Sequence, residues 1–271
     1  MQDGKIELSK NDITTNLPYD PRVSLAFDHH ESEMDRLKAV ETGGKLIIDP
    51  KARSAARVVY DYYGGKEAFP RISEDLMAAV DKGDSADFTM DEILDPKGWV
   101  LLHYLMDART GLGRFHHFRI SNYDLMMELI DYCLDHDIDE ILELPDVKER
   151  VELYFEQAEQ FKAQLRRIAR VHDKVVVLDL RKEEVIHAGN RFMIYALYPE
   201  TEISVHVAWG FRKQNTAVMI GKSIVNKASQ VDIGELCLQY GGGGHRNAGT
   251  CQMDNDVVDE KLPDIIRALN G

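Results

Sequence analysis

The sequence predicts a two-domain α/β protein whose domains are joined by a long helix. In residues 1–125, short apolar runs alternate with segments of helical spacing, a pattern typical of a parallel sheet with connecting helices. A long amphipathic stretch follows, and the last third of the chain again contains apolar runs of strand length. We therefore expect an N-terminal domain at 1–125, a helical connector at 126–170 and a smaller α/β domain at 171–271.

Two apolar runs in the N-terminal domain predict buried strands. They lie at residues 23–27 and 45–48, and polar residues, proline or glycine bound each of them. Residues 53–63 and 74–80 have helical spacing, and Ser73 is expected to cap the second helix. This alternation favours a parallel sheet.

The connector carries one apolar face, on which residues recur at alternating spacings of four and three. These residues are Val147, Val151, Tyr154, Ala158, Phe161, Leu165 and Ile168. Asp146 follows Pro145 and precedes Glu149 by three residues, which resembles a capping box. We interpret the apolar face as a packing surface rather than a cofactor site.

In the C-terminal domain, three apolar runs predict strands, at residues 175–180, 203–209 and 216–221. Residues 190–198 are expected to form a helix between the first two strands. Residues 259–269 are expected to form a final helix.

The composition limits the class of partner. A net charge of −14 repels long duplex nucleic acid but allows a small phosphorylated ligand in a local basic pocket, and it suits a site that recruits divalent cations. We find neither an apolar run near the roughly 20 residues of a membrane span nor a signal-peptide core. The three cysteines lack paired spacing and are expected to be free thiols in a reducing cytoplasm. The oligomeric state stays open, a homodimer included.

The most informative segment is GGGGHRNAG, at residues 241–249. Glycine lets the backbone approach a ligand closely or adopt positive φ, and successive peptide N–H groups can converge on an anion. A histidine and an arginine at the exit add donors suited to phosphate oxygens. The pattern favours a phosphate or carboxylate cradle over a plain turn, formed by Gly242, Gly243, Gly244, His245 and Arg246.

A second informative segment is the triplet Asp28-His29-His30, which follows a predicted strand. Its carboxylate and imidazole donors suit Mn²⁺, Fe²⁺, Co²⁺ or Zn²⁺ better than Mg²⁺ alone. Ligands of open α/β sheets gather at the carboxyl ends of the strands, where this triplet is expected. Taken alone, the triplet fits a surface feature as well as a metal site.

The triplet, AAVDKGDSADF at residues 78–88 and the glycine run occur in an order that resembles the DHH phosphoesterase superfamily with its DHH-associated C-terminal domain. Within that superfamily the chain is most similar to bacterial exopolyphosphatase-related and nanoRNase-like proteins. The resemblance covers nearly the whole chain. It implies hydrolysis of phosphoester or phosphoanhydride bonds with a pair of Mn²⁺ ions.

The resemblance also implies roles for individual residues of the N-terminal domain. His29 would ligate a metal, and Asp81 would be the later carboxylate ligand, with Asp84 as a weaker candidate. Asp28 would support the histidines, and His30 would contact the phosphate and assist the leaving group.

In the C-terminal domain, the resemblance implies that His245 and Arg246 hold substrate phosphate. Arg212, in GFRK after a predicted strand, would be the substrate-facing arginine. Two metal ions can polarise a phosphoryl oxygen and share a hydroxide nucleophile, and arginines neutralise the developing charge. The C-terminal domain would act as a lid.

The chain departs from the family pattern at the first metal motif. Members carry aspartates after an earlier strand, and the position of the bridging aspartate is occupied here by Asn16, whose amide oxygen is a weaker metal donor. One explanation is that the chain lacks its first βα unit, which predicts an exposed apolar edge where that strand would pack. Without the unit, we expect binding of at most one metal ion and little hydrolysis.

The sequence therefore predicts a Mn²⁺-dependent hydrolase of a short phosphate-rich substrate, such as polyphosphate, a short oligonucleotide or a cyclic dinucleotide. The alternative is a nucleotide- or oligonucleotide-binding protein with a degenerate metal site and no hydrolysis. Two Mn²⁺ ions per chain would favour the enzyme, and none or one would favour the binding protein. A structural zinc protein is disfavoured because paired cysteines are absent from the sequence.

Overall fold

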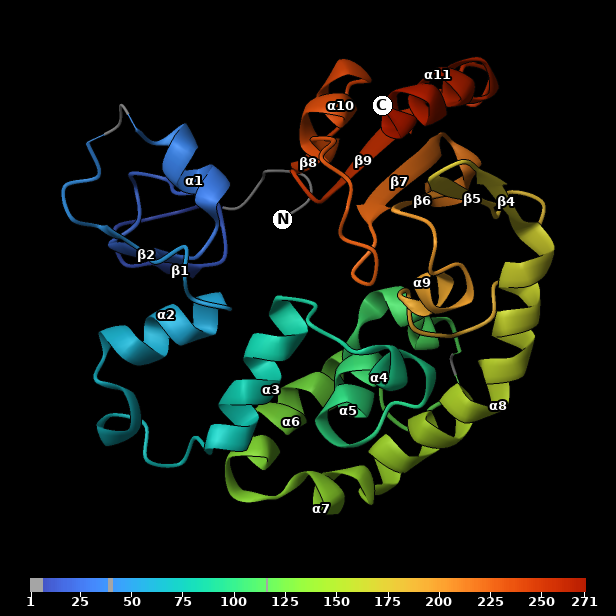
Figure 1. Ribbon diagram of the computed structural model, residues 1–271. Helices are drawn as coiled ribbons and strands as arrows, with labels where there is room; N and C mark the ends of the chain where they lie inside the picture. The colour runs from blue at the N-terminus through green and yellow to red at the C-terminus, as the bar shows by residue number, and fades with distance from the viewer. Residues whose placement is uncertain (1–6, 39–40, 116) are drawn as a thin grey trace. The chain divides into compact units, whose positions relative to one another are not determined.

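The computed structural model describes residues 7–38, 41–115 and 117–271. The chain divides into two compact units, and Figure 1 shows their elements in chain order. Unit 1 comprises residues 1–87 with 133–135, and unit 2 comprises residues 88–132 with 136–271. The boundaries expected from the sequence, at residues 125 and 170, stay a prediction.

Unit 1 is built on a three-stranded parallel sheet in the order β1-β2-β3. The strands are β1 at Ile13–Thr15, β2 at Leu25–Asp28 and β3 at Leu46–Ile48. Phe27 pairs with Thr15 on one side and Ile47 on the other, so β2 is the central strand and Asp28 lies at its carboxyl end. The predicted α/β class and parallel N-terminal sheet are confirmed.

In unit 1, capping side chains fix the start of two of the three described helices. They are α1 at Glu31–Arg36, α2 at Ala55–Tyr62 and α3 at Glu74–Asp84, with a 3₁₀ turn at Gly65–Glu67. Ser73 Oγ accepts a hydrogen bond from Leu76 N at 3.1 Å, so the predicted cap of α3 is confirmed. Ser54 caps α2 in the same way, with Arg57 N as the donor at 3.0 Å.

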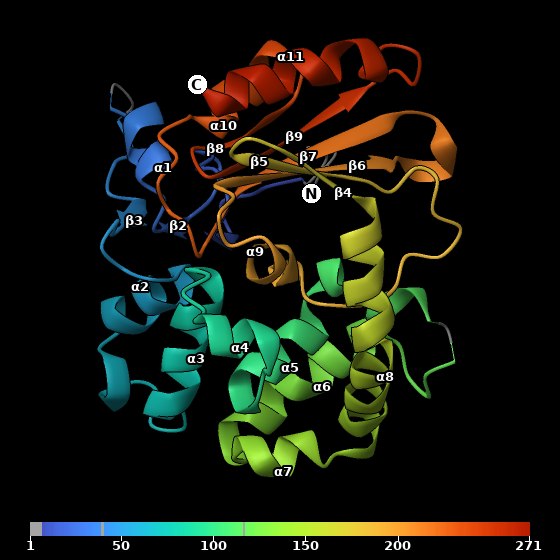
Figure 2. The ribbon, with the colours of Figure 1, turned by 45° about the vertical axis from the view of Figure 1, so that its right-hand side comes forward.

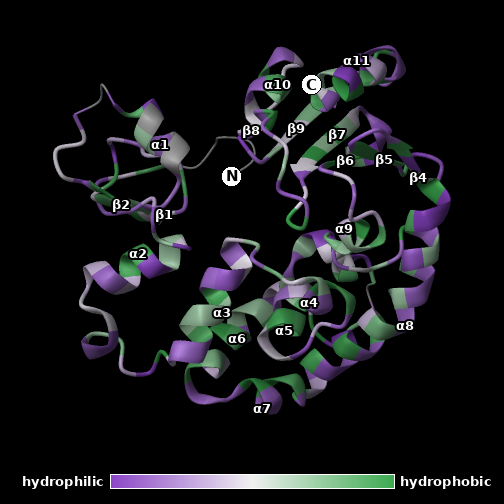
Figure 3. Ribbon diagram, viewed as in Figure 1, coloured by the Kyte–Doolittle hydropathy of each residue, from purple (hydrophilic) through white to green (hydrophobic). Residues whose placement is uncertain are grey.

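The helical part of unit 2 ends in the long helix α8. Its elements are α4 at Met90–Leu94, α5 at Gly98–Met106, 3₁₀ turns at Ala108–Thr110 and Leu112–Arg114, α6 at Asn122–Asp135, α7 at Ile138–Leu142 and α8 at Pro145–Ile168. Figure 3 shows the hydrophilic and hydrophobic bands that make α8 amphipathic, as predicted.

The predicted capping box of α8 is wrong. Leu144 occupies the N-cap and makes no side-chain cap, while Pro145 begins the helix. Asp146 instead accepts a hydrogen bond from Arg119 Nε at 2.9 Å. The cap is unnecessary for Pro145 itself, since proline has no N–H to satisfy.

The rest of unit 2 is a six-stranded mixed sheet in the order β4-β5-β6-β7-β9-β8. The strands are β4 at Ala169–His172, β5 at Val175–Asp179, β6 at Ile203–Trp209, β7 at Thr216–Lys222, β8 at Gly243–His245 and β9 at Ala248–Met253. Among these described strands, β5 and β6 pair in parallel and the other neighbours pair antiparallel. The three predicted strands are confirmed.

Helices cover both faces of this sheet. These are α9 at Met193–Leu197, α10 at Ile233–Gln239 and α11 at Val258–Asn270. Figures 1 and 2 show α10 and α11 on one face and α9 on the other. Alternation along β6 explains the layers, because Val205 and Val207 are fully buried in the core that includes α10 and α11, while Ser204 Oγ lies 2.7 Å from Tyr195 Oη of α9. Within the described ranges, no helix is long and apolar enough to cross a membrane.

Candidate functional site

The DHH triplet lies at the carboxyl end of β2. Asp28 is 3% exposed, and its Oδ1 accepts hydrogen bonds from His29 N at 2.8 Å and from His30 Nδ1 at 2.7 Å. Burial raises the pKa of Asp28, but the hydrogen bonds from His30 and His29 outweigh burial and leave that pKa below its usual value. The same bond to Asp28 raises the pKa of His30. Asp28 therefore stays ionised and orients the His30 ring.

His29 joins the triplet to helix α3. Its Nδ1 lies 3.2 Å from the Ala52 carbonyl oxygen, which can only accept, so Nδ1 carries a proton. Its Nε2 lies 3.1 Å from Asp84 Oδ2. The pair therefore brings an imidazole nitrogen and a carboxylate oxygen to a separation at which both could ligate one cation, and a hydrogen bond from the other ring nitrogen to a backbone carbonyl is the support that a metal-ligating histidine commonly has.

Asp81, the carboxylate predicted to ligate the metal, has different partners. Its Oδ1 accepts from Ser54 Oγ at 2.7 Å, and its Oδ2 accepts from Arg57 Nη2 at 2.7 Å and Nε at 3.0 Å. Both oxygens therefore tie α3 to the start of α2. In the part of unit 1 that the structure describes, Asp84 rather than Asp81 reaches His29.

The described residues supply two donors rather than a complete metal sphere. No group of three or more His, Cys, Asp or Glu side chains converges among residues 7–38, 41–115 and 117–271. Asn16 follows β1 with a φ of 57°, and its N–H donates to the Phe27 carbonyl oxygen at 2.9 Å. This places Asn16 at the same sheet edge as Asp28.

The glycine run of unit 2 forms part of a hairpin, and close packing requires two of its four glycines. A Cβ on Gly242 would lie 2.2 Å from the Thr250 carbonyl oxygen, and one on Gly244 would lie 2.3 Å from the Ala248 carbonyl oxygen. Gly241 has a φ of 71°. Gly243 has neither constraint, because an added Cβ would meet nothing within 4 Å and its φ is not positive. At Gly243 the fold therefore leaves open space.

The turn of the hairpin consists of Arg246 and Asn247, between the paired residues His245 and Ala248. Two backbone hydrogen bonds fix it, from Ile233 N to the Arg246 carbonyl oxygen at 3.2 Å and from Lys222 N to the Asn247 carbonyl oxygen at 2.9 Å. The turn therefore has a fixed place beside the end of β7.

Lys222 is a candidate residue that the sequence did not reveal. Burial, and then the charge of Arg246, lower the pKa of Lys222, so the two cations are neighbours. Neither forms an ion pair with a residue that the structure describes. The charge of Asp232 acts on Lys222 in the opposite direction, but it forms no ion pair with Lys222, and two neighbouring cations of this kind favour a bound anion.

Arg212 is not brought to this turn. It lies in the loop before β7, whose first residue, Thr216, pairs with Met253. The hairpin turn lies at the other end of β7, where Gly221 pairs with Ala248. Five residue-to-residue steps along β7 separate these pairs, about 17 Å at roughly 3.4 Å per step. The residues predicted to bind phosphate therefore lie at opposite ends of β7, with Arg212 at one end and the hairpin turn at the other.

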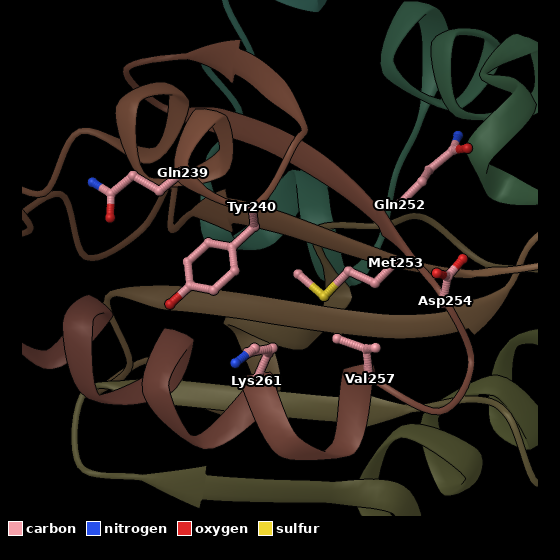
Figure 4. Close-up of a pocket in the computed structure, with 7 residues that line it drawn as sticks. All are labelled: Gln239, Tyr240, Gln252, Met253, Asp254, Val257 and Lys261. Atoms are coloured by element: carbon pink, nitrogen blue, oxygen red, sulfur yellow. The ribbon is translucent and has the colours of Figure 1, made fainter.

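A hollow of about 360 Å³ lies between α10, β9 and α11 (Figure 4). Tyr240, Met253 and Lys261 are among the residues that line it. The predicted site residues do not line it.

Comparison with solved structures identifies the family. PggH from Vibrio cholerae, a pGpG-specific phosphodiesterase, is 54% identical to this chain, and the match covers 99% of this chain and 87% of PggH with a TM-score of 0.78. The chain belongs to the DHH phosphoesterase superfamily.

Two more distant structures also match this DHH phosphoesterase. An exopolyphosphatase-related protein from Bacteroides fragilis is 15% identical over 91% of this chain and 65% of its own, with a TM-score of 0.46. A DHH domain from a member of a family of ribosomal proteins is 14% identical over 92% of this chain and 68% of its own, with a TM-score of 0.44. No protein-family model and no curated protein sequence matches the chain.

Proposed function

We propose that this DHH phosphoesterase is a phosphodiesterase that hydrolyses the linear dinucleotide pGpG. The single observation that carries the proposal is the 54% identity to PggH over 99% of the chain. A substrate of this size agrees with a net charge of −14, because a dinucleotide needs only a local basic site.

The substrate carries one terminal phosphate and one phosphodiester, and each unit, taken by itself, has groups suited to one task. The cations Lys222 and Arg246 beside Gly243 are suited to binding phosphate oxygens. His30, oriented and kept basic by Asp28, is suited to transferring a proton to the leaving oxygen. We assign phosphate binding to the hairpin and proton transfer to the triplet.

Manganese is part of the proposal. His29 Nε2 and Asp84 Oδ2 would hold the ion, and Asp81 would join them only if Arg57 released it. Water and substrate oxygens would complete the sphere, since the described residues bring no third such side chain to the pair. When bound, the ion lowers the pKa of a ligated water molecule and stabilises charge on the phosphoryl oxygens.

A substrate screen with Mn²⁺ tests the proposal. We expect pGpG to be converted into two molecules of GMP at least tenfold faster than cyclic di-GMP, a longer oligonucleotide or polyphosphate. His30→Ala should lower kcat by about 10²–10⁴-fold, the usual contribution of general acid–base catalysis. The matched control His136→Ala removes an exposed histidine of unit 2 and should leave kcat unchanged. Preference for polyphosphate, or full activity of His30→Ala, would contradict the proposal.

The second candidate function is binding of the dinucleotide without hydrolysis. Asn16 at the sheet edge and the two-donor arrangement favour it, because an amide adds no charge to hold dications. Recovery of intact pGpG after prolonged incubation with an equal amount of protein and Mn²⁺ would support this function.

A further inference from the structure

The loop between β6 and β7, residues 210–215, has a strained centre. Arg212 and Lys213 both have left-handed backbone conformations, with φ values of 52° and 57°. Gln214 N donates to the Phe211 carbonyl oxygen at 3.2 Å, which closes a turn with the two cations at its centre. Such left-handed centres favour Asn-Gly, because a Cβ is strained there. The chain thus keeps two bulky cations where glycine would be more stable.

Side chains from β7 and the β9–α11 connection hold this loop in place. Asn255 Nδ2 donates to the Lys213 carbonyl oxygen at 2.8 Å, and Thr216 Oγ1 donates to Asn255 Oδ1 at 2.9 Å. Asn215 Nδ2 also donates to Gln252 Oε1 at 3.0 Å. The loop is therefore fixed, and its strain is balanced by these contacts.

The fixed loop displays an exposed aromatic ring beside one cation, and the second cation of the loop lies over Trp209. Phe211 is 72% exposed, and the guanidinium carbon of Arg212 lies 5.0 Å from its ring centroid. Lys213 Nζ lies 5.8 Å from the ring of Trp209. Neither Arg212 nor Lys213 forms an ion pair with the carboxylates that the structure describes. An exposed aromatic ring with a guanidinium over it and a second cation nearby is the chemistry that binds a base and its phosphate.

We propose that this loop is a second nucleotide-binding site, distinct from the glycine hairpin at the other end of β7. A purine base stacks on Phe211, and Arg212 and Lys213 bind the phosphate. Arg212 and Lys213 stand where this turn prefers Asn-Gly. This departure supports a binding role, since sequences depart from local conformational preference chiefly at functional positions. Binding at the loop requires neither the DHH triplet nor hydrolysis.

Trp209 provides a direct probe, because it adjoins Lys213. The full chain with Trp99→Phe leaves Trp209 as its one tryptophan, and its fluorescence is measured during titration with GMP. We expect a saturable change. Ribose 5-phosphate, which has the phosphate but no base, should bind at least tenfold more weakly. Equal binding of the two ligands, or no change with GMP, would overturn the proposal.

Two variants separate a binding role from a structural one. Phe211→Ala should weaken GMP binding about tenfold. The double variant R212G/K213G should abolish the signal while its melting temperature equals or exceeds that of the parent, because glycine relieves the turn. Lys222→Ala, at the hairpin, should leave the signal intact. The proposal fails if Phe211→Ala binds GMP normally, or if the signal is lost in Lys222→Ala.

Discussion

His29 Nε2 lies 3.1 Å from Asp84 Oδ2, whereas Asp81, one helical turn earlier on α3, is held by Arg57 and Ser54. Two carboxylates on one helix thus have different tasks. The more exposed one faces the DHH triplet, and the buried one fastens α3 to α2.

Substitution of the two aspartates should separate metal binding from stability. Asp84→Asn should weaken Mn²⁺ binding about 10–100-fold with little change in the free energy of unfolding. Asp81→Asn should lower that free energy by about 1.5–3 kcal/mol, because it weakens hydrogen bonds to a charged partner. Calorimetric Mn²⁺ titration and urea denaturation measure the two effects. If Asp81→Asn weakens Mn²⁺ binding and Asp84→Asn lowers the free energy of unfolding instead, Asp81 is the ligand.

Alanine at Gly243 should affect ligand binding without affecting the fold. The new Cβ meets no protein atom within 4 Å, so the melting temperature should be unchanged, while affinity for pGpG should fall about tenfold or more. Gly242→Ala is the matched control, since its Cβ would lie 2.2 Å from a carbonyl oxygen and should destabilise the hairpin. Normal pGpG affinity in Gly243→Ala would show that the hairpin does not hold the substrate.

Arg150 is expected to be the position of α8 most sensitive to substitution. Its guanidinium group is fully buried and contacts Asn122 Oδ1, Glu149 Oε1, the carbonyl oxygens of Ile120 and Asp146, and the ring of Phe118. Arg150→Ala should cost about 3–5 kcal/mol of stability, because it leaves buried acceptors without a donor. Arg166→Ala, on the exposed face of α8, should cost less than about 0.5 kcal/mol. Equal urea midpoints for the two variants would refute this.

His206 should make unit 2 sensitive to acid. Burial, and then the charge of Arg191, lower the pKa of His206 to about 4, against about 6.5 in an unfolded chain. Because the folded pKa is depressed, the unfolded state binds the proton more readily, and stability present above about pH 6.5 is lost as the pH falls toward 4. The loss is at most about 3 kcal/mol.

Unfolding free energies of the wild type and His206→Gln, measured from about pH 7 to about pH 4, check this expectation. The variant should lose less stability over that range. His172→Gln, which replaces an exposed histidine of β4, should follow the wild type. Parallel curves for all three proteins would show that His206 does not titrate as expected.

The sequence predicts most of the helices and strands that position the site, because hydrophobic periodicity and helix-capping residues are signals that can be read from neighbouring residues alone. Ser73 and the apolar run before Asp28 are examples. The resemblance favoured Asp81 over Asp84 as the metal ligand, and the sequence could not reveal that Asp84 reaches His29, since the two aspartates share a helix face and differ only in partners from other elements. The sequence did not identify Lys222, because Arg246 becomes its neighbour only through the pairing of β7 with β9. The adjoining strand β8 is too short and glycine-rich to predict.

The glycine run shows the same limit. Its composition predicts close approach of backbone, and close approach is what Gly242 and Gly244 provide. Whether the approaching group is a ligand or another strand depends on tertiary packing. Of the glycines in β8 and just before it, Gly243 is the one at which we still interpret the glycine as making room for a ligand.

The most direct test of the account measures GMP release from pGpG by chelator-treated protein during stepwise addition of Mn²⁺, with Asp84→Asn assayed in parallel. We predict that the wild type regains activity and that the variant requires about 10–100-fold more Mn²⁺ to do so. Release of GMP that is independent of Mn²⁺, or no release at any concentration, would contradict the account.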